Sequence, residues 1–216
     1  VTPIPDLVPP HDMLFGLRDI SRDPGFHLRS WEGATQTLQP VLNLYFADLE
    51  QQGIHLEPRF LRLIQALEGY HRRVLDGTER PESKHEERVQ RILGSVPSEC
   101  AEWLKGKLKY SNELSLGARL SALCKKHMEM MKRVARDRSW IDTAVGIRND
   151  YSHQKQDSKN YEVAEVLTVS ERLKLLLDLC LLSECGFDSQ EILKLVERYW
   201  RRHPPILAID AEKALI

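Results

Sequence analysis

Residues 59–72 read RFLRLIQALEGYHR, and this stretch decides the fold class. The apolar side chains that recur here and just beyond at helical spacing are Phe60, Leu63, Ile64, Leu67 and Val74. A stripe with this period is typical of an amphipathic helix that buries one face. Pro58 suits a first helical turn and Gly77 suits a helix end. The sequence therefore predicts a helix that begins at Glu57-Pro58 and ends at Gly77.

Outward from this stretch, helical spacing recurs along most of the chain, and no sustained alternation of β-branched and polar residues interrupts it. A first helix is expected from Ser30 to Gly53, with Pro40 kinking it or dividing it in two. Further helices are expected at residues 83–94, 98–109, 115–135 and 162–185, from Ser139 or Asp142 through residue 153, and from Asp188 to just before Pro204. The expected fold is all-α: a single helical bundle over residues 30–216, preceded by an irregular arm or linker over residues 1–29.

The composition is that of a globular protein, with 42% hydrophobic and 29% charged residues among 216. No apolar run approaches the roughly 18–20 residues needed to cross a bilayer, and the N-terminus lacks the pattern of a signal peptide. None of the four cysteines forms a Cys-x-x-Cys pair, which argues against a zinc ribbon. These features predict a cytoplasmic protein without a membrane segment, metal or cofactor. The start at Val1 suggests one domain of a longer protein.

Charge is distributed unevenly along the chain. The whole sequence carries a formal charge of −1, which argues mildly against a dedicated nucleic-acid binder. Residues 118–138, however, contain seven basic and two acidic side chains. This segment has two interpretations: a solvated helix face, or a phosphate-facing surface. In the second interpretation the residues expected to contact RNA are Lys132, Arg133, Arg136 and Arg138.

The segment Ile147-Arg148-Asn149-Asp150-Tyr151-Ser152-His153 holds the candidate catalytic residues Arg148, Asn149 and His153. An arginine can hold a phosphate, and a histidine can transfer protons near neutral pH. Asn149 and His153 are four residues apart and share a helix face, whereas Arg148 and His153 diverge by roughly 140° on a regular helix. The structural alternative is that an arginine and a histidine near a helix end only cap carbonyls and offset the helix dipole.

Glu68 and His71 are candidates for a supporting role at the active cleft. The alternative for Glu68 is an exposed ion pair with Arg72, four residues along the same helix, which would contribute only a few tenths of a kcal/mol. His127 and the neighbouring methionines are expected to belong to the core and surface of a long helix.

The order Arg-Asn-x-x-x-His at residues 148–153 resembles the signature of the HEPN superfamily. Trp31, Pro40 and the long block at residues 59–72 resemble the opening of the ApeA-like HEPN group. The likeness covers most of residues 12–200. It implies an α-helical, metal-independent endoribonuclease of the toxin or antiviral defence type. It also implies an active site formed where two copies meet, and a separate N-terminal sensor domain ahead of the helical part.

From this resemblance we expect attack of a ribose 2′-hydroxyl on the neighbouring phosphate, with His153 as general base or acid, Arg148 at the phosphate and Asn149 orienting. Some HEPN toxins have a tyrosine two residues after the histidine, where a partner attaches a nucleotide. Lys155 stands there in this chain, so that control is not expected. Members with a degraded signature are non-catalytic. The alternative function is therefore a helical module that binds RNA or protein without chemistry.

Overall fold

The computed structural model describes residues 13–50, 55–135, 137–153 and 161–203. Within these ranges the chain forms helices and a single isolated β-bridge between Thr78 and Glu113, so the predicted all-α fold is confirmed. The helices are α1 (Pro24–Glu50), α2 (Leu56–Val74), α3 (Glu82–Leu93), α4 (Ser98–Leu108), α5 (Leu116–Lys126), α6 (Met128–Val134), α7 (Ser139–His153), α8 (Val163–Glu184) and α9 (Ser189–Trp200). None of them is both long enough and apolar enough to cross a membrane.

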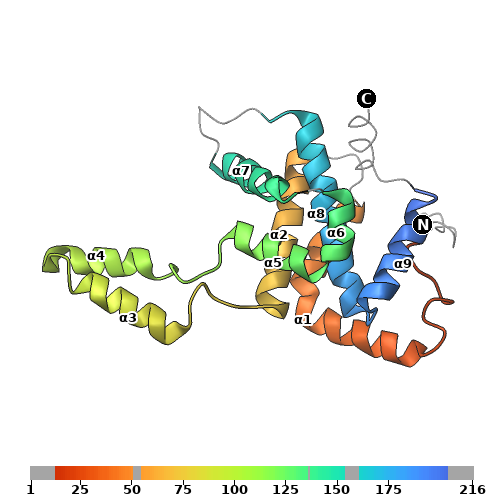
Figure 1. Cartoon of the computed structure of the whole chain (residues 1–216), viewed down its shortest axis with the longest axis horizontal. Coiled ribbons are helices and arrows are strands. Elements are labelled where there is room, and N and C mark those ends of the chain that lie inside the picture. Colours follow the sequence, from red (N-terminus) through yellow and green to blue (C-terminus); the bar gives the residue numbers. More distant parts are fainter. Residues whose placement is uncertain (1–12, 51–54, 136, 154–160, 204–216) are drawn as a thin grey trace, which may run out of the picture.

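Helix α8 forms the centre of the bundle. It packs against α1, α2, α5, α7 and α9, and most of its side chains from Val166 to Leu182 are buried, while Glu171, Lys174 and Asp178 lie half-buried on one side. A helix that buries most of its circumference is stable only inside a core. Helix α2 lies beside it and buries the stripe predicted from Phe60 onward (Figure 1). These two helices therefore form the framework on which the other elements are placed.

Helix α1 begins earlier than expected, at Pro24 rather than near Ser30. The side chain of Asp23 accepts a hydrogen bond of 2.9 Å from the amide of Phe26 and so caps the helix, while Pro24 occupies the first turn. Of the two alternatives predicted at Pro40, a kink or a division of the helix, the division is wrong, because α1 is continuous to Glu50. In Figure 1 the first part of α1 runs along the base of the bundle and its later part rises beside α2.

The single helix expected over residues 115–135 is also wrong, because the chain breaks at His127. This residue ends α5 and precedes α6, with φ −112° and ψ 34°. The apolar spacing continues across the break, since Cys124, Met130, Met131 and Val134 are all buried. The break turns α6 so that its own face joins the core, and His127 itself is buried.

Helices α3 and α4 form a hairpin that projects away from the bundle (Figure 1). They pack against each other, and neither contains a fully buried residue. Both helices lie within one residue of the predicted bounds. Their apolar side chains meet only across the hairpin, so this element adds little to the core.

Candidate functional site

Helix α7 presents the candidate site because only one of its faces is needed for packing. Its buried residues are Trp140, Ile141, Ala144 and Ile147. They recur at helical spacing and seat α7 against α2, α5 and α8. The opposite face is left free for chemistry.

The three motif residues lie at the C-terminal end of α7. Arg148 is half-buried, and its Nη1 donates a hydrogen bond of 3.1 Å to Oδ1 of Asn149. Asn149 and His153 are exposed, and His153 is the last residue of the helix. Because α7 is helical throughout, Arg148 and His153 keep the roughly 140° divergence of a regular helix. One protomer therefore directs these two side chains to different faces.

Tyr161 is a neighbour of the motif that sequence reasoning missed. A Cβ added at Gly146 would overlap the Tyr161 hydroxyl, so the absence of a side chain there lets the phenol lie directly on the helix. Gly146, Asn149 and His153 are spaced i, i+3 and i+7 and share one face of α7. Burial and, after it, the carboxylate of Asp150 raise the pKa of Tyr161 above its ordinary value. A glycine inside a helical pattern was the available signal.

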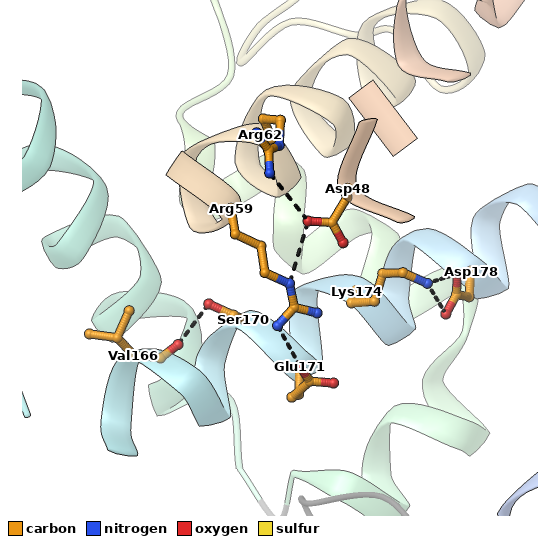
Figure 2. A network of polar contacts seen from close by, with 8 residues as sticks. All are labelled: Asp48, Arg59, Arg62, Val166, Ser170, Glu171, Lys174 and Asp178. Carbon is orange, nitrogen blue, oxygen red and sulfur yellow. Dashed lines mark hydrogen bonds and ion pairs between the residues drawn. The ribbon is translucent and has the colours of Figure 1, made fainter. Parts of the chain in front are cut away.

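Tyr151, within the motif segment, packs against α2. The rings of Phe60 and Tyr151 meet edge to face with centroids 5.8 Å apart, and burial followed by Glu57 raises the pKa of Tyr151. Beside Phe60, Arg59 bridges α1 and α8: its Nη1 donates to Oε1 of Glu171 at 2.7 Å, and its Nε lies 3.4 Å from Oδ1 of Asp48 (Figure 2). Tyr151 therefore joins α7 to α2 at Phe60, and the preceding residue of α2, Arg59, links α2 to α1 and α8.

The basic segment at residues 118–138 does not form one surface. Arg119 is buried, and its Nη1 lies 3.2 Å from Nδ1 of His71. Lys126 donates to the Tyr70 hydroxyl at 3.1 Å, and Arg133 pairs with Glu197. Lys132, Arg133 and Arg138 are exposed, whereas Arg136 lies outside the described residues. Part of the local positive charge thus holds the bundle together.

His71 is remote from the motif. It lies eleven residues along α2 from Phe60, or about 16 Å at 1.5 Å per residue. Burial and, after it, the charge of Arg119 lower its pKa, and the neutral ring can accept the Arg119 hydrogen bond. Its surroundings indicate a structural role inside the bundle.

Glu68 is half-buried, and the ion pair expected between it and Arg72 is replaced by another. Arg72 Nη2 donates to Oε2 of Glu113 at 2.7 Å, which ties α2 to the segment before α5. The structure thus places Arg148, Asn149 and His153 at the C-terminal end of α7, and it does not bring Glu68 or His71 to them. Among the residues that the structure describes, no group of three or more His, Cys, Asp or Glu is arranged to hold a metal ion.

One family model matches more than half of the chain. Residues 61–191 match the family model described as Apea-like HEPN. The matched segment begins in α2 and ends in α9, so it includes the hairpin, Glu171 and all three motif residues. No curated protein and no solved structure matches the chain.

Proposed function

The chain belongs to the Apea-like HEPN family, and from this premise we propose that it is an endoribonuclease that cuts RNA without a metal ion. Membership suggests an RNase-type effector. The observation that carries the proposal is the C-terminal end of α7, where the half-buried Arg148 is bonded to Asn149 and the side chains of Asn149 and His153 are exposed. The proposed setting is the effector domain of a larger cytoplasmic toxin or antiphage defence protein, with a sensor domain elsewhere in that protein.

The proposed reaction is attack of a ribose 2′-oxygen on the adjacent phosphorus. The bond to the 5′-oxygen of the next nucleotide breaks, leaving a 2′,3′-cyclic phosphate and a 5′-hydroxyl. His153 is exposed and free to take the 2′-hydroxyl proton or to protonate the leaving oxygen. Arg148 would stabilise charge on the phosphate oxygens. The Arg148–Asn149 hydrogen bond supports a role for Asn149 in orienting the guanidinium.

The active unit is proposed to be a homodimer. Arg148 and His153 face roughly 140° apart on a regular α7, so one protomer holds them poorly on a single phosphate. A two-fold partner would place its own Arg148 and His153 against the same cleft.

Light scattering should then give a mass near twice 25.0 kDa. Specific activity should fall on dilution through the dissociation range, and constant activity in a monomeric sample would refute the shared cleft.

The test of the chemistry compares His153→Ala and Arg148→Ala with Ser152→Ala, a matched control at an exposed position of the same turn. Loss of proton transfer should slow RNA cleavage by about 10²–10⁴-fold in His153→Ala. Arg148→Ala should lose a comparable factor, and Ser152→Ala should stay near wild type. Melting temperatures should be equal, because neither motif side chain is part of the core.

Two outcomes of this test would count against the proposal. Wild-type cleavage by His153→Ala or Arg148→Ala would remove the proposed site, and cleavage abolished by a chelator would remove the metal-free mechanism. If the wild-type protein binds RNA but cuts none, the chain is better described as a non-catalytic RNA-binding module.

A further inference from the structure

The α3–α4 hairpin has a fixed direction although it lies outside the bundle. Its stem is held by Asn112, whose side chain is 7% exposed. Asn112 Oδ1 accepts from the amide of Arg80 at 3.0 Å, its Nδ2 donates to the Arg80 carbonyl at 3.1 Å, and its own carbonyl accepts from the amide of Glu79 at 2.9 Å. A stem bonded in this way presents the hairpin as a defined arm. In Figure 1 the arm projects on the side of the bundle where α7 lies.

The two most exposed aromatic side chains of the described residues are Trp103 on α4, at 65%, and Tyr110, at 64%, in the turn that follows the helix. Lys109 keeps helical dihedrals beyond Leu108, the last residue of α4. Trp103, Lys107 and Tyr110 are spaced i, i+4 and i+7, so they share the outer face of α4 as it continues into this turn. The half-buried residues of α4 are Ala101, Leu104 and Leu108. They lie on another side of the helix, so packing against α3 does not explain Trp103 or Tyr110.

The charge from Trp103 onward indicates the kind of partner, while the acidic side chains of α4, Glu99 and Glu102, lie before Trp103, and Glu102 pairs with Lys105. Residues 103–110 contain three lysines and no acidic residue, and all three lysines are exposed. Lys109 Nζ lies 5.1 Å from the centroid of the Tyr110 ring. Protein interfaces are enriched in aromatic residues but depleted in lysine. Sites for single-stranded nucleic acid, in contrast, combine exposed aromatic rings with positive charge along the backbone path.

We propose that the outer face of α4, with Trp103 and Tyr110 as stacking platforms and Lys107 beside them, binds single-stranded RNA. The inference rests on the proposed function, because it supplies that cleavage site with a substrate-holding arm. Trp103 and Tyr110 are seven residues apart, or about 10.5 Å along the helix, which is about three base-stacking steps of 3.4 Å. The arm therefore favours unpaired RNA, whose bases are free to stack.

The experiment measures binding of a fluorescently labelled oligouridylate to protein carrying His153→Ala, which separates binding from cleavage. Adding Trp103→Ala should raise the dissociation constant by about 5- to 150-fold, the equivalent of losing one stacked base. Trp103→Phe should recover most of the affinity, because a phenyl ring still stacks. Phe46→Ala, which removes an aromatic ring of 44% exposure on α1, is the matched control and should bind like its parent.

A second measurement repeats the binding assay at several salt concentrations. Lys107→Ala should reduce the slope of log affinity against log salt by about 0.7, the value for one contact with a single strand. Equal affinity of the Trp103→Ala and parent proteins would overturn the proposal, as would the absence of any binding to the oligouridylate. Loss of dimer mass in Trp103→Ala with RNA affinity unchanged would overturn it in favour of a protein interface. If binding depends on Trp103 but the wild-type protein cuts no RNA, the proposed RNA-binding role of the hairpin stands and only the proposed nuclease activity is refuted.

Discussion

The central helices α2 and α8 and the projecting α3–α4 hairpin contain similar apolar side chains, but the central helices bury them and the hairpin leaves them partly or largely exposed. Helices α2 and α8 bury Phe60, Leu176 and their neighbours completely, and ion pairs of Arg59 link both helices to α1 (Figure 2). Helices α3 and α4 contain Val89, Leu104 and Trp103 but bury none of them fully. Stability therefore belongs to the bundle, while the hairpin is a surface element held by its stem. Helix α7 combines both, with one face in the core and the side chains of Asn149 and His153 exposed on the other.

The largest expected effect is in the bundle. Phe60→Ala removes a fully buried ring that also contacts Tyr151, and it should lower the free energy of unfolding by about 3–5 kcal/mol. Denaturant unfolding measures this value, and the loss should also loosen α7 and reduce RNA cleavage. A loss below that of an ordinary surface substitution would show that the core does not hold the motif.

The next effect is on acid stability and again belongs to the bundle. Burial, followed by the charge of Lys126, lowers the pKa of His127 to about 4 from an ordinary value of 6.5. The unfolded chain therefore binds more protons between these values, so stability present above pH 6.5 is lost as the pH falls toward 4. The loss is about 3 kcal/mol for this group. Unfolding at a series of pH values should show that slope, and His127→Gln should flatten it; an unchanged slope would place the acid sensitivity elsewhere.

A smaller effect is expected where the core meets the free face of α7. Gly146→Ala would place a methyl group against the Tyr161 hydroxyl, and the displacement should cost about 1–3 kcal/mol, as overpacking typically does. The double variant Gly146→Ala, Tyr161→Phe removes the overlapping oxygen and should recover part of that loss. Gly117→Ala is the control on α5, where the added Cβ meets only ordinary contacts of 3.7 Å or more. Equal effects at the two glycines would contradict the close approach of Tyr161.

The smallest effect is expected in the hairpin. Trp103→Ala removes the largest side-chain type from a residue that is 65% exposed, and stability should change by no more than about 0.5 kcal/mol. Denaturant unfolding of Trp103→Ala and Phe60→Ala under the same conditions compares their free energies of unfolding directly, since both variants lose an aromatic ring. A destabilisation of similar size in the two variants would mean that the hairpin is part of the core.

Much of the fold could be predicted because apolar periodicity follows burial directly. The helices at residues 83–94 and 98–109 were predicted to within one residue, and Asp188 caps α9 as expected, with its side chain accepting from the amides of Gln190 and Glu191. The start of α1 was misplaced because Pro and Gly near residue 24 resemble a linker. The informative pair was Asp23-Pro24, a capping residue followed by a first-turn proline.

Tertiary packing explains what the sequence could not show. No local signal marks His127 as a break, because the apolar spacing on both sides suits one continuous helix; the break exists because α5 and α6 each reach a different part of the core. At the site, Arg148, Asn149 and His153 were singled out by the resemblance of residues 148–153 to the HEPN signature, and their catalytic role stays a prediction. Tyr161 and the link from Arg59 to Asp48 and Glu171 join residues far apart in sequence, and only the fold brings them together.

The bridge between Thr78 and Glu113 bears on how the molecule can be altered. The main chain leaves the bundle and returns through these two neighbouring residues, so the segment between them begins and ends at nearly one point. Segments with adjacent ends can be lengthened, shortened or replaced without separating the elements that they connect. The segment between Thr78 and Glu113 can therefore be replaced as a unit. A short turn, or a hairpin from another protein, would leave α2 and α5 at their present separation. If the hairpin binds RNA as proposed, its exchange should change the RNA preference while α7 stays in place.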